Sequence, residues 1–211
     1  MLIVVLGKKG SGKDTFSDYI IEKHGFIKYS FADPLKKGLQ HFFNLSDEQL
    51  YDPKLKEIID PRWGVSPRQL FQVIGTDFFQ YSLKQFLPKI NINNEFDDTR
   101  THWVILFKQW YAKLLKENET ENEKENETEN QKIKNPINVI IADGRFLHEI
   151  EEIRKMGGKI IKVVRPTLDN NKDNHKSEME MDEIPNEYID NIIYNQGSLG
   201  EFYDMIDKLL I

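Results

Sequence analysis

The chain of 211 residues contains no cysteine. This absence excludes disulfide bonds and cysteine-ligated metal centres, and it fits a reducing compartment. Long apolar runs are missing too: the opening run at residues 2–6 is far too short to span a membrane, and it lacks the charged start and cleavage site of a signal peptide. We therefore expect a cytoplasmic protein with no membrane partner. Hydrophobic residues make up 39% of the chain, which is enough for one α/β core.

The chain also lacks a surplus of positive charge. Its formal net charge is −6, and residues 117–131, ENETENEKENETENQ, carry seven Glu against one Lys. This tract therefore accounts for the whole net charge, and the remainder of the chain is balanced. Without a basic surplus, we expect no nucleic-acid partner.

The acidic tract has no apolar face, so burial cannot offset the entropy cost of ordering it. We predict a disordered insertion over residues 117–135 within a single domain of residues 1–211. A docking tail and a charged extension of the preceding helix are the alternatives.

Short apolar runs alternate with helical patterns along the rest of the chain. Strands are predicted at residues 2–6, 26–31, 137–142, 159–164 and 189–194. Helices are predicted at about 13–24, 34–44, 67–87, 101–116, 146–156 and 198–210. This alternation predicts an α/β fold with a parallel sheet of about five strands flanked by helices. The helix-rich stretch 34–116 has no obvious strand, and we expect it to form a separate lobe.

Residues 7–15, GKKGSGKDT, fit the phosphate-binding pattern G-x-x-x-x-G-K. The motif follows a buried-strand pattern and opens a helix, so the backbone N–H groups and the helix N-terminus would face phosphate oxygens. Lys13 should reach the β- and γ-phosphates, with Lys8 or Lys9 adding charge at the rim. A strand-to-helix turn with coincidental glycines is the alternative. The candidate nucleotide-binding residues are Gly10, Ser11, Gly12, Lys13, Asp14 and Thr15.

Asp14 stands where this motif usually carries Ser or Thr. That hydroxyl normally coordinates Mg²⁺, and a carboxylate can hold the same ion directly or through water. Thr15 still offers a hydroxyl and a backbone N–H. Asp14 therefore predicts a Mg²⁺-nucleotide site of a less common type, with helix capping as the alternative role.

A second group of polar residues follows the strand predicted at 137–142. Asp143 comes directly after this strand, and Arg145 lies two residues later. Ligands of open parallel sheets bind beyond the carboxyl ends of the strands, so Asp143 should share an edge with the phosphate-binding loop. Asp143 suits Mg²⁺ and Arg145 suits a phosphate, although Asp143 could instead cap the next helix. Glu149 falls one helical turn after Arg145, where it faces the same site or forms an i, i+4 ion pair.

The chain has only six arginines beside 23 lysines. In this composition an arginine marks a position where lysine will not serve, and Arg68 in the segment RQLFQVIGTD is one such position. The polar segment 166–185 lies between two predicted strands, which favours a lid that excludes water over the phosphates. A plain surface loop is the alternative, and His175 within it is more typical of a structural or solvent-facing histidine.

The motifs GKKGSGKDT, FADPLK, RWGVSPRQLFQVIGTD, DGRFLHE, VVRP, HKSE and NQGSL occur in this order. Together they resemble the deoxynucleoside monophosphate kinases of tailed phages and large DNA viruses. The resemblance covers most of the chain except the acidic tract and residues 84–100. It implies a nucleoside-monophosphate-kinase-like fold, ATP and Mg²⁺ as cofactors, and transfer of the γ-phosphate to a deoxynucleoside 5′-monophosphate, in the host cytoplasm if the protein is viral.

Carried over by position, the resemblance also assigns roles to individual residues. It implies that ATP binds at Gly12, Lys13, Asp14 and Thr15, while the expectation that Asp14 and Asp143 hold the metal rests on the chemistry of their carboxylates. The residues implied to act on the transferred group are Lys13, Lys9, Arg145 and Asp143. The residues implied to bind the acceptor are Lys9, Trp63, Arg68, Asp143, Arg145, Glu149 and Ser177. Two positions depart from the family pattern. Gly10 stands where the family can carry a basic side chain, so one phosphate contact is either missing or supplied by Lys8. Two extra residues separate Trp63 from Arg68, so Trp63 either stacks on the base or is a buried aromatic.

Two other classes of protein share parts of these patterns. Animal-type phosphomevalonate kinases resemble the GKD loop and the D-x-R pattern, and a nucleotide-driven switch or motor would share the phosphate-binding loop. The N/T-K-x-D motif of GTPases is not found in the sequence. A homodimer is the default expectation for a small enzyme of this kind.

Overall fold

The computed structural model describes residues 1–89, 101–129, 136–167, 180–181 and 183–210. Within these ranges the chain divides into two compact units. The first unit consists of Met1–Ser30 and Phe107–Ile211, and the second of Phe31–Leu106. Each unit is treated separately below.

A five-stranded parallel sheet forms the centre of the first unit. Its strands are β1 (Leu2–Leu6), β2 (Ile27–Tyr29), β3 (Val139–Ile141), β4 (Lys159–Val164) and β5 (Asn191–Tyr194). They lie in the order β2-β3-β1-β4-β5, so β1 is central between β3 and β4. The predicted parallel α/β sheet is confirmed, although β2, β3 and β5 are shorter than their sequence patterns indicate.

Alternate side chains of the strands build the two faces of this sheet. On one face, Ile3 and Val5 of β1 join α1 (Lys13–His24) and α9 (Leu199–Leu210) in a core that includes Phe16 and Phe202. All five residues of β1 are buried, which explains why this strand reads as a continuous apolar run. Helix α1 spans the range predicted for it.

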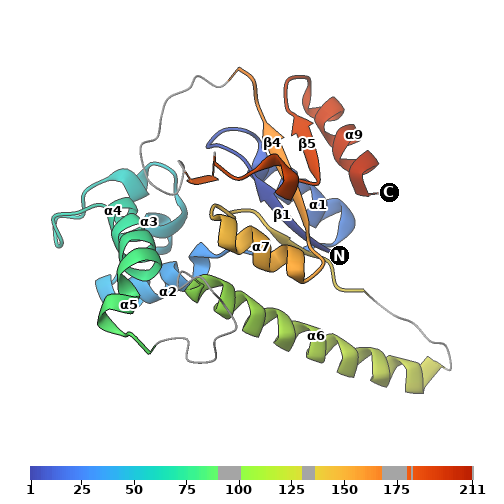
Figure 1. Ribbon diagram of the computed structural model, residues 1–211, viewed down its shortest axis with the longest axis horizontal. Helices are drawn as coiled ribbons and strands as arrows, with labels where there is room; N and C mark the ends of the chain where they lie inside the picture. The colour runs from blue at the N-terminus through green and yellow to red at the C-terminus, as the bar shows by residue number, and fades with distance from the viewer. Residues whose placement is uncertain (90–100, 130–135, 168–179, 182, 211) are drawn as a thin grey trace. The chain divides into compact units, whose positions relative to one another are not determined.

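The helix α7 (Leu147–Lys155) covers the opposite face, in front of the strands in Figure 1. Its apolar side chains Ile150 and Ile153 are fully buried. Arg154 on this helix donates to the carbonyl of Tyr188, which ends the short 3₁₀ helix η3 (Asn186–Tyr188), and pairs with Asp190 at 3.0 Å. These contacts fix α7 against the segment that leads into β5.

The long helix α6 (His102–Glu129) begins in the second unit and continues in the first. In the first unit, Phe107 and Trp110 pack their rings against Tyr29 of β2. Lys108 also donates to Glu152 of α7 at 2.7 Å. One ring cluster and one ion pair therefore fix α6 beside the sheet.

The structure corrects the prediction of disorder over residues 117–129, because α6 runs through the acidic tract to Glu129. The physical reason is cooperativity: once residues 102–116 are helical, each further residue adds one hydrogen bond without a new nucleation cost. Glu, Lys and Gln are also good helix formers. The charged extension of the helix, one of the two alternatives, is thus the observed state, and residues 130–135 lie outside the described residues.

The described part of the second unit is helical, apart from an isolated antiparallel bridge between Asp60 and Val65. Its elements are α2 (Ala32–Phe43), α3 (Asp47–Tyr51), η1 (Leu55–Glu57), α4 (Pro67–Gln72), η2 (Val73–Ser82), α5 (Leu83–Phe86) and the first residues of α6. Ser46 and Ser66 each form a capping box with the Gln three residues later. These capping boxes fix the first residues of α3 and α4.

Elements α4, η2 and α5 follow one another without a break where a single helix is predicted, but η2 is a π-helix. Side chains occupy two of its carbonyl groups: Trp103 Nε1 donates to the Gly75 carbonyl at 3.2 Å, and Ser82 Oγ donates to the Asp77 carbonyl at 2.8 Å. Competing donors of this kind disturb the α-helical ladder. Gly75 also packs directly against Leu35 of α2, where a Cβ would collide.

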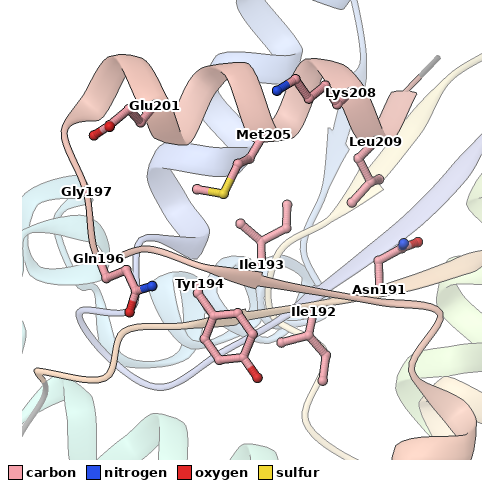
Figure 2. Close-up of a pocket in the computed structure, with 10 residues that line it drawn as sticks. All are labelled: Asn191, Ile192, Ile193, Tyr194, Gln196, Gly197, Glu201, Met205, Lys208 and Leu209. Carbon is pink, nitrogen blue, oxygen red and sulfur yellow. The ribbon is translucent and has the colours of Figure 1, made fainter.

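A groove of about 630 Å³ lies between β5 and α9. Figure 2 shows Ile193, Met205 and Leu209 pointing into the space between strand and helix, while Ile192 and Tyr194 point to the other side of β5. Its described lining includes none of the predicted site residues. We find no helix in the described ranges that is long and apolar enough to cross a membrane.

Replacing residues 117–131 with a Gly/Ser linker of equal length should lower the far-UV helical signal but leave the melting temperature within about 3 °C. The reason is that Lys116, Glu117 and Glu119 are exposed, so the change costs less than about 1 kcal/mol, or about 2–4 °C in a chain of this size. Circular dichroism melting of both proteins tests this, and a much larger fall would show that the tract is required for folding.

Candidate functional site

The phosphate-binding loop, residues 7–15, connects the central strand β1 to α1. It needs glycine for two different reasons. A Cβ on Gly7 would lie 2.7 Å from the carbonyl oxygen of Val163 in β4, so the space beside β1 admits no side chain. Gly12 has a φ of 102°, which L side chains rarely adopt. The turn closes where the Ser11 N–H donates to the Lys8 carbonyl at 3.0 Å.

Asn195 fixes this loop from the far side. It follows β5 directly, and its Nδ2 donates to the Ser11 carbonyl at 2.9 Å. The Asn195 backbone N–H is itself held by the Val164 carbonyl of β4 at 2.8 Å. The same side chain fills the space that a Cβ on Gly12 would need. The shape of the loop is therefore set by β4 and by the residue that follows β5.

The charged residues of the loop differ in exposure. The Lys13 side chain is largely buried, while Asp14 is 74% exposed and its carboxylate lies 3.5 Å from Lys13 Nζ. Lys8, Lys9 and Gly10 are exposed, as expected for a rim that meets phosphates. Asp14 lies in the first turn of α1, where a carboxylate is favourable to the helix dipole. It does not cap the helix, because the N-cap is Gly12 and no side chain makes a cap hydrogen bond there.

Asp143 follows β3, the strand that pairs with β1, so it lies at the same edge of the sheet as the loop. Its Oδ2 accepts a hydrogen bond from Ser30 Oγ at 2.6 Å, and Ser30 in turn follows β2. The N-cap of α7 is Phe146, and its N–H donates to Glu149 Oε2. Glu149 therefore caps this helix, a role that the sequence analysis gave as the alternative for Asp143.

Glu149 is the buried carboxyl group of this site, with only 2% of its surface exposed. Its Oε2 accepts the backbone N–H groups of Arg145 at 2.8 Å and Phe146 at 3.1 Å. Burial raises the pKa of Glu149 to about 8, and the nearby Asp143 carboxylate acts in the same direction. Glu149 therefore positions the backbone of Arg145, a role that neither sequence alternative included.

In the second unit, Trp63 lies on a loop fixed by a buried carboxylate. Asp60 is 4% exposed and accepts hydrogen bonds from Arg62 Nε at 2.9 and 3.2 Å, from Arg62 Nη2 at 2.6 Å, and from Gln49 Nε2 at 2.9 Å. The hydrogen bonds from Arg62 hold the pKa of Asp60 well below its usual range. A lysine at position 62 could not replace this bidentate contact, because its ammonium group lacks the planar fork of a guanidinium.

Trp63 itself is 45% exposed, so the buried-aromatic alternative is wrong. Its indole N–H donates to the Phe43 carbonyl at 2.8 Å, and the Phe43 ring packs edge-on against it at 5.2 Å. One part of the ring is thus anchored while the other part is accessible. The prediction that Trp63 stacks on a base remains a prediction.

The remaining predicted residues fall in three places. Arg68 is partly buried in the first turn of α4 in the second unit. Ser177 and His175 lie outside the described residues, as does most of the predicted lid at 166–185. At the end of that segment Met181 and Ile184 are buried, so this part of it is anchored in the fold.

The oxygen donors of the first unit fit a metal that arrives with a nucleotide. Across the described residues, no three His, Cys, Asp or Glu side chains gather as a metal cluster. Mg²⁺ bound with a nucleotide needs only one or two carboxylates, because water and phosphate oxygens complete its shell. Asp14 and Asp143 provide such carboxylates on the loop and on the neighbouring strand end.

Comparison with known proteins agrees with this arrangement of loop and strand ends. The family model described as deoxynucleotide monophosphate kinase matches residues 1–60 and 54–206. A protein named putative deoxynucleotide monophosphate kinase, from Acanthamoeba polyphaga mimivirus, is 37% identical over 98% of this chain and 94% of its own length. This chain belongs to the deoxynucleotide monophosphate kinase family.

More distant members come from phages. The deoxynucleotide monophosphate kinase of Escherichia phage RB69 is 27% identical over 99% of both chains. That of Enterobacteria phage T4 is 26% identical over 99% of this chain and 98% of its own. Among solved structures, a dephospho-CoA kinase from Campylobacter jejuni aligns over 99% of this chain and 94% of its own, with 17% identity and a TM-score of 0.39.

Sequence reasoning missed Asn195 and Ser30 as members of the kinase site. Asn195 directly follows the strand predicted at 189–194, which is the same signal that identified Asp143, whereas Ser30 lies inside the strand predicted at 26–31. A polar residue at that position faces the edge where ligands of parallel sheets bind. The signal was therefore present for Asn195, but it needed the strand order to show that β5 contributes to this edge. For Ser30 it was hidden, because β2 ends at Tyr29, two residues earlier than predicted.

We expect Glu149→Gln to change the pH dependence of stability. Because the folded-state pKa of Glu149 is raised to about 8, wild type binds an extra proton in the folded state between the unfolded pKa near 4.5 and about 8. Its stability relative to the mutant should therefore fall by up to a few kcal/mol as pH rises through this window and stay constant above it.

Urea unfolding of both proteins from pH 5 to pH 9 measures this difference. Titrating groups that the two proteins share cancel in the difference between their unfolding free energies. Gln keeps the carbonyl oxygen that accepts both backbone N–H groups, so the substitution removes only the ionisable group. A stability difference that is independent of pH would show that Glu149 is ionised throughout.

Proposed function

We propose that this chain moves the γ-phosphate of ATP to the 5′-phosphate of a deoxynucleoside monophosphate, giving a deoxynucleoside diphosphate and ADP. One observation carries the proposal: in a member of the deoxynucleotide monophosphate kinase family, a preformed phosphate-binding loop lies at the carboxyl end of β1, next to the strand end that carries Asp143. The product supplies deoxynucleotide synthesis.

The donor phosphates bind to the backbone N–H groups of residues 10–15 and to Lys13. Backbone donors held by Asn195 and by the glycine conformations need no reorganisation when the phosphates arrive, which is where electrostatic stabilisation is strongest. Lys13 stabilises the charge that develops on the transferred group, and Lys9 adds positive charge at the exposed rim. Enzymes accelerate phosphoryl transfer mainly by positioning the reactants and stabilising this negative charge.

Asp14 and Asp143 would hold Mg²⁺, directly or through water. When bound, the ion neutralises charge on the β- and γ-phosphates. Asp14 needs a cation between itself and a phosphate, because its carboxylate is otherwise repelled. Its position 3.5 Å from Lys13 Nζ supports a role at the phosphates.

Arg145 and its neighbours are assigned to the acceptor phosphate. Glu149 fixes the Arg145 backbone through a 2.8 Å hydrogen bond from the Arg145 N–H, so the Cα from which the guanidinium extends is held at this strand end. A guanidinium binds phosphate through two parallel hydrogen bonds. The second unit would contribute Trp63 as a stacking surface and Arg68 as a further cation, and Ser177 completes the proposed acceptor set.

Family membership does not favour the alternatives of a phosphomevalonate-kinase-like enzyme or a nucleotide-driven switch. The exposed ring of Trp63 can stack on a nucleobase, whereas a small aliphatic acid offers no flat ring for it to stack on. A cytoplasmic location and a homodimer remain part of the proposal. We assign residues 34–116 to acceptor binding and residues 166–185 to a lid.

A panel of deoxy- and ribonucleoside monophosphates with Mg-ATP, scored for ADP formation, tests the activity. We expect turnover with at least one deoxynucleoside monophosphate, and Lys13→Ala should lower kcat by about 10²-fold or more through lost charge stabilisation. Lys208→Ala is the matched control, because Lys208 is an exposed lysine on α9. The proposal fails if wild type forms no ADP beyond its ATPase background with any acceptor.

The role of Asp14 can be measured through the metal. At fixed ATP, the Mg²⁺ concentration needed for half-maximal rate should rise in the order wild type, Asp14→Ser, Asp14→Asn, Asp14→Lys. Serine restores the commoner hydroxyl ligand, asparagine keeps an oxygen without the charge, and lysine places a cation at the metal position. An identical Mg²⁺ requirement in all four proteins would leave Asp14 with its helix-dipole role alone.

A further inference from the structure

One buried polar side chain of the second unit is left without a hydrogen bond in the described part of the chain. Gln80 in the π-helix η2 is 3% exposed, and neither its Nε2 nor its Oε1 has a hydrogen-bond partner in the described part of the chain. A buried polar group without a partner destabilises the fold, and native proteins contain few of them. A carboxamide left in this state requires an explanation beyond packing.

The backbone around Gln80 is also unusual. π-helical segments are rare and are frequently found at functional sites. In this segment Phe79, the preceding residue, stacks on His102 at 4.5 Å and packs against Trp103 at 4.9 Å. Phe79 thus contacts the aromatic side chains of α6, and Gln80, the next residue, lies on the adjoining face, which is also buried.

That adjoining face carries a polar stripe. Arg68, Gln72, Thr76 and Gln80 follow one another at intervals of four residues along the unbroken segment α4–η2. Residues four apart are neighbours on a helix surface. Arg68 and Gln72 are partly buried, and Thr76 and Gln80 are buried, so the stripe leads from a cation inward to the unsatisfied amide.

The chemistry of the amide limits what it can bind. Gln offers two donors and one acceptor side by side, so a phosphate, which only accepts, would leave the Gln80 oxygen unpaired. An apolar ligand would leave both atoms unpaired. A nucleobase edge presents a donor next to an acceptor, and Gln binds such an edge through two parallel hydrogen bonds.

We propose that Gln80 binds the base of the acceptor nucleotide and that its amide is satisfied only when that base is present. This inference rests on the proposed function and adds the residue that recognises the base. On the polar stripe, Arg68 provides positive charge at one end and Gln80 provides paired hydrogen bonds at the other. An acceptor nucleotide carries the matching groups, a phosphate and a base.

Steady-state kinetics of Gln80→Leu test the proposal. The KM for the preferred deoxynucleoside monophosphate should rise at least about tenfold, equivalent to about 1.4 kcal/mol, while the KM for ATP and kcat stay within about twofold. The rise in melting temperature that this nucleotide produces in wild type should shrink in parallel. Gln85→Leu is the matched control, because Gln85 is an exposed glutamine on α5 of the same helical segment.

A merely structural Gln80 gives a different pattern. Leu would then raise the melting temperature by removing an unsatisfied polar group and leave the KM for the nucleotide unchanged, which would overturn the proposal. If the Leu variant does not fold, Gln80→Asn carries the test, since it keeps the amide but withdraws it by one methylene and should still raise the same KM. Wild type that accepts no deoxynucleotide contradicts the proposed function itself, whereas an active wild type with an unchanged KM in the variants contradicts only the role of Gln80.

Discussion

The backbone of the phosphate-binding loop is the constraint on which the site depends. β1 is central in the sheet, so its carboxyl end is enclosed by β3 and β4. The chain must turn there without a side chain at Gly7, because the Val163 carbonyl occupies the space. Asn195 then binds the Ser11 carbonyl and closes the loop from the side of β5. Backbone donors that are fixed by contacts within the protein stabilise developing charge without a reorganisation cost.

The acidic side chains around this loop are placed so that their repulsion of a phosphate is small. Asp14 is exposed and close to Lys13, and Asp143 shares its carboxylate with the hydroxyl of Ser30. Glu149 is the exception in burial, and its pKa near 8 keeps the carboxyl group mostly protonated at neutral pH. The edge of the sheet therefore carries less negative charge than its sequence suggests. A neutral Glu149 still fixes the start of α7, because its oxygen accepts two backbone N–H groups.

Periodicity and motif spacing predicted the parallel sheet, α1, and the loop beside Asp143, since each depends on local sequence. Other features depended on tertiary contacts. The brace from Asn195 requires the strand order, and the π-helix requires Trp103 to reach the Gly75 carbonyl from 28 residues away. The acidic tract was mispredicted because its composition was judged in isolation, whereas helix propagation from the preceding residues decides its state. Glu149 as a cap was missed because an i, i+4 pair with Arg145 was the nearer explanation.

The second unit shows how differently a fold can treat two buried polar residues. Asp60 receives hydrogen bonds from the side chains of Arg62 and Gln49, and the loop that carries Trp63 is rigid as a result. Gln80, in the same unit, has neither of its polar atoms satisfied in the described chain. Since this unit satisfies a buried carboxylate with side-chain hydrogen bonds from two neighbours, the unsatisfied amide is not explained by a shortage of polar partners in the sequence. A group whose partner arrives with the substrate is costly in the free protein and favourable in the complex. That difference is the physical basis by which a buried amide can distinguish a ligand with a matching edge from one without it.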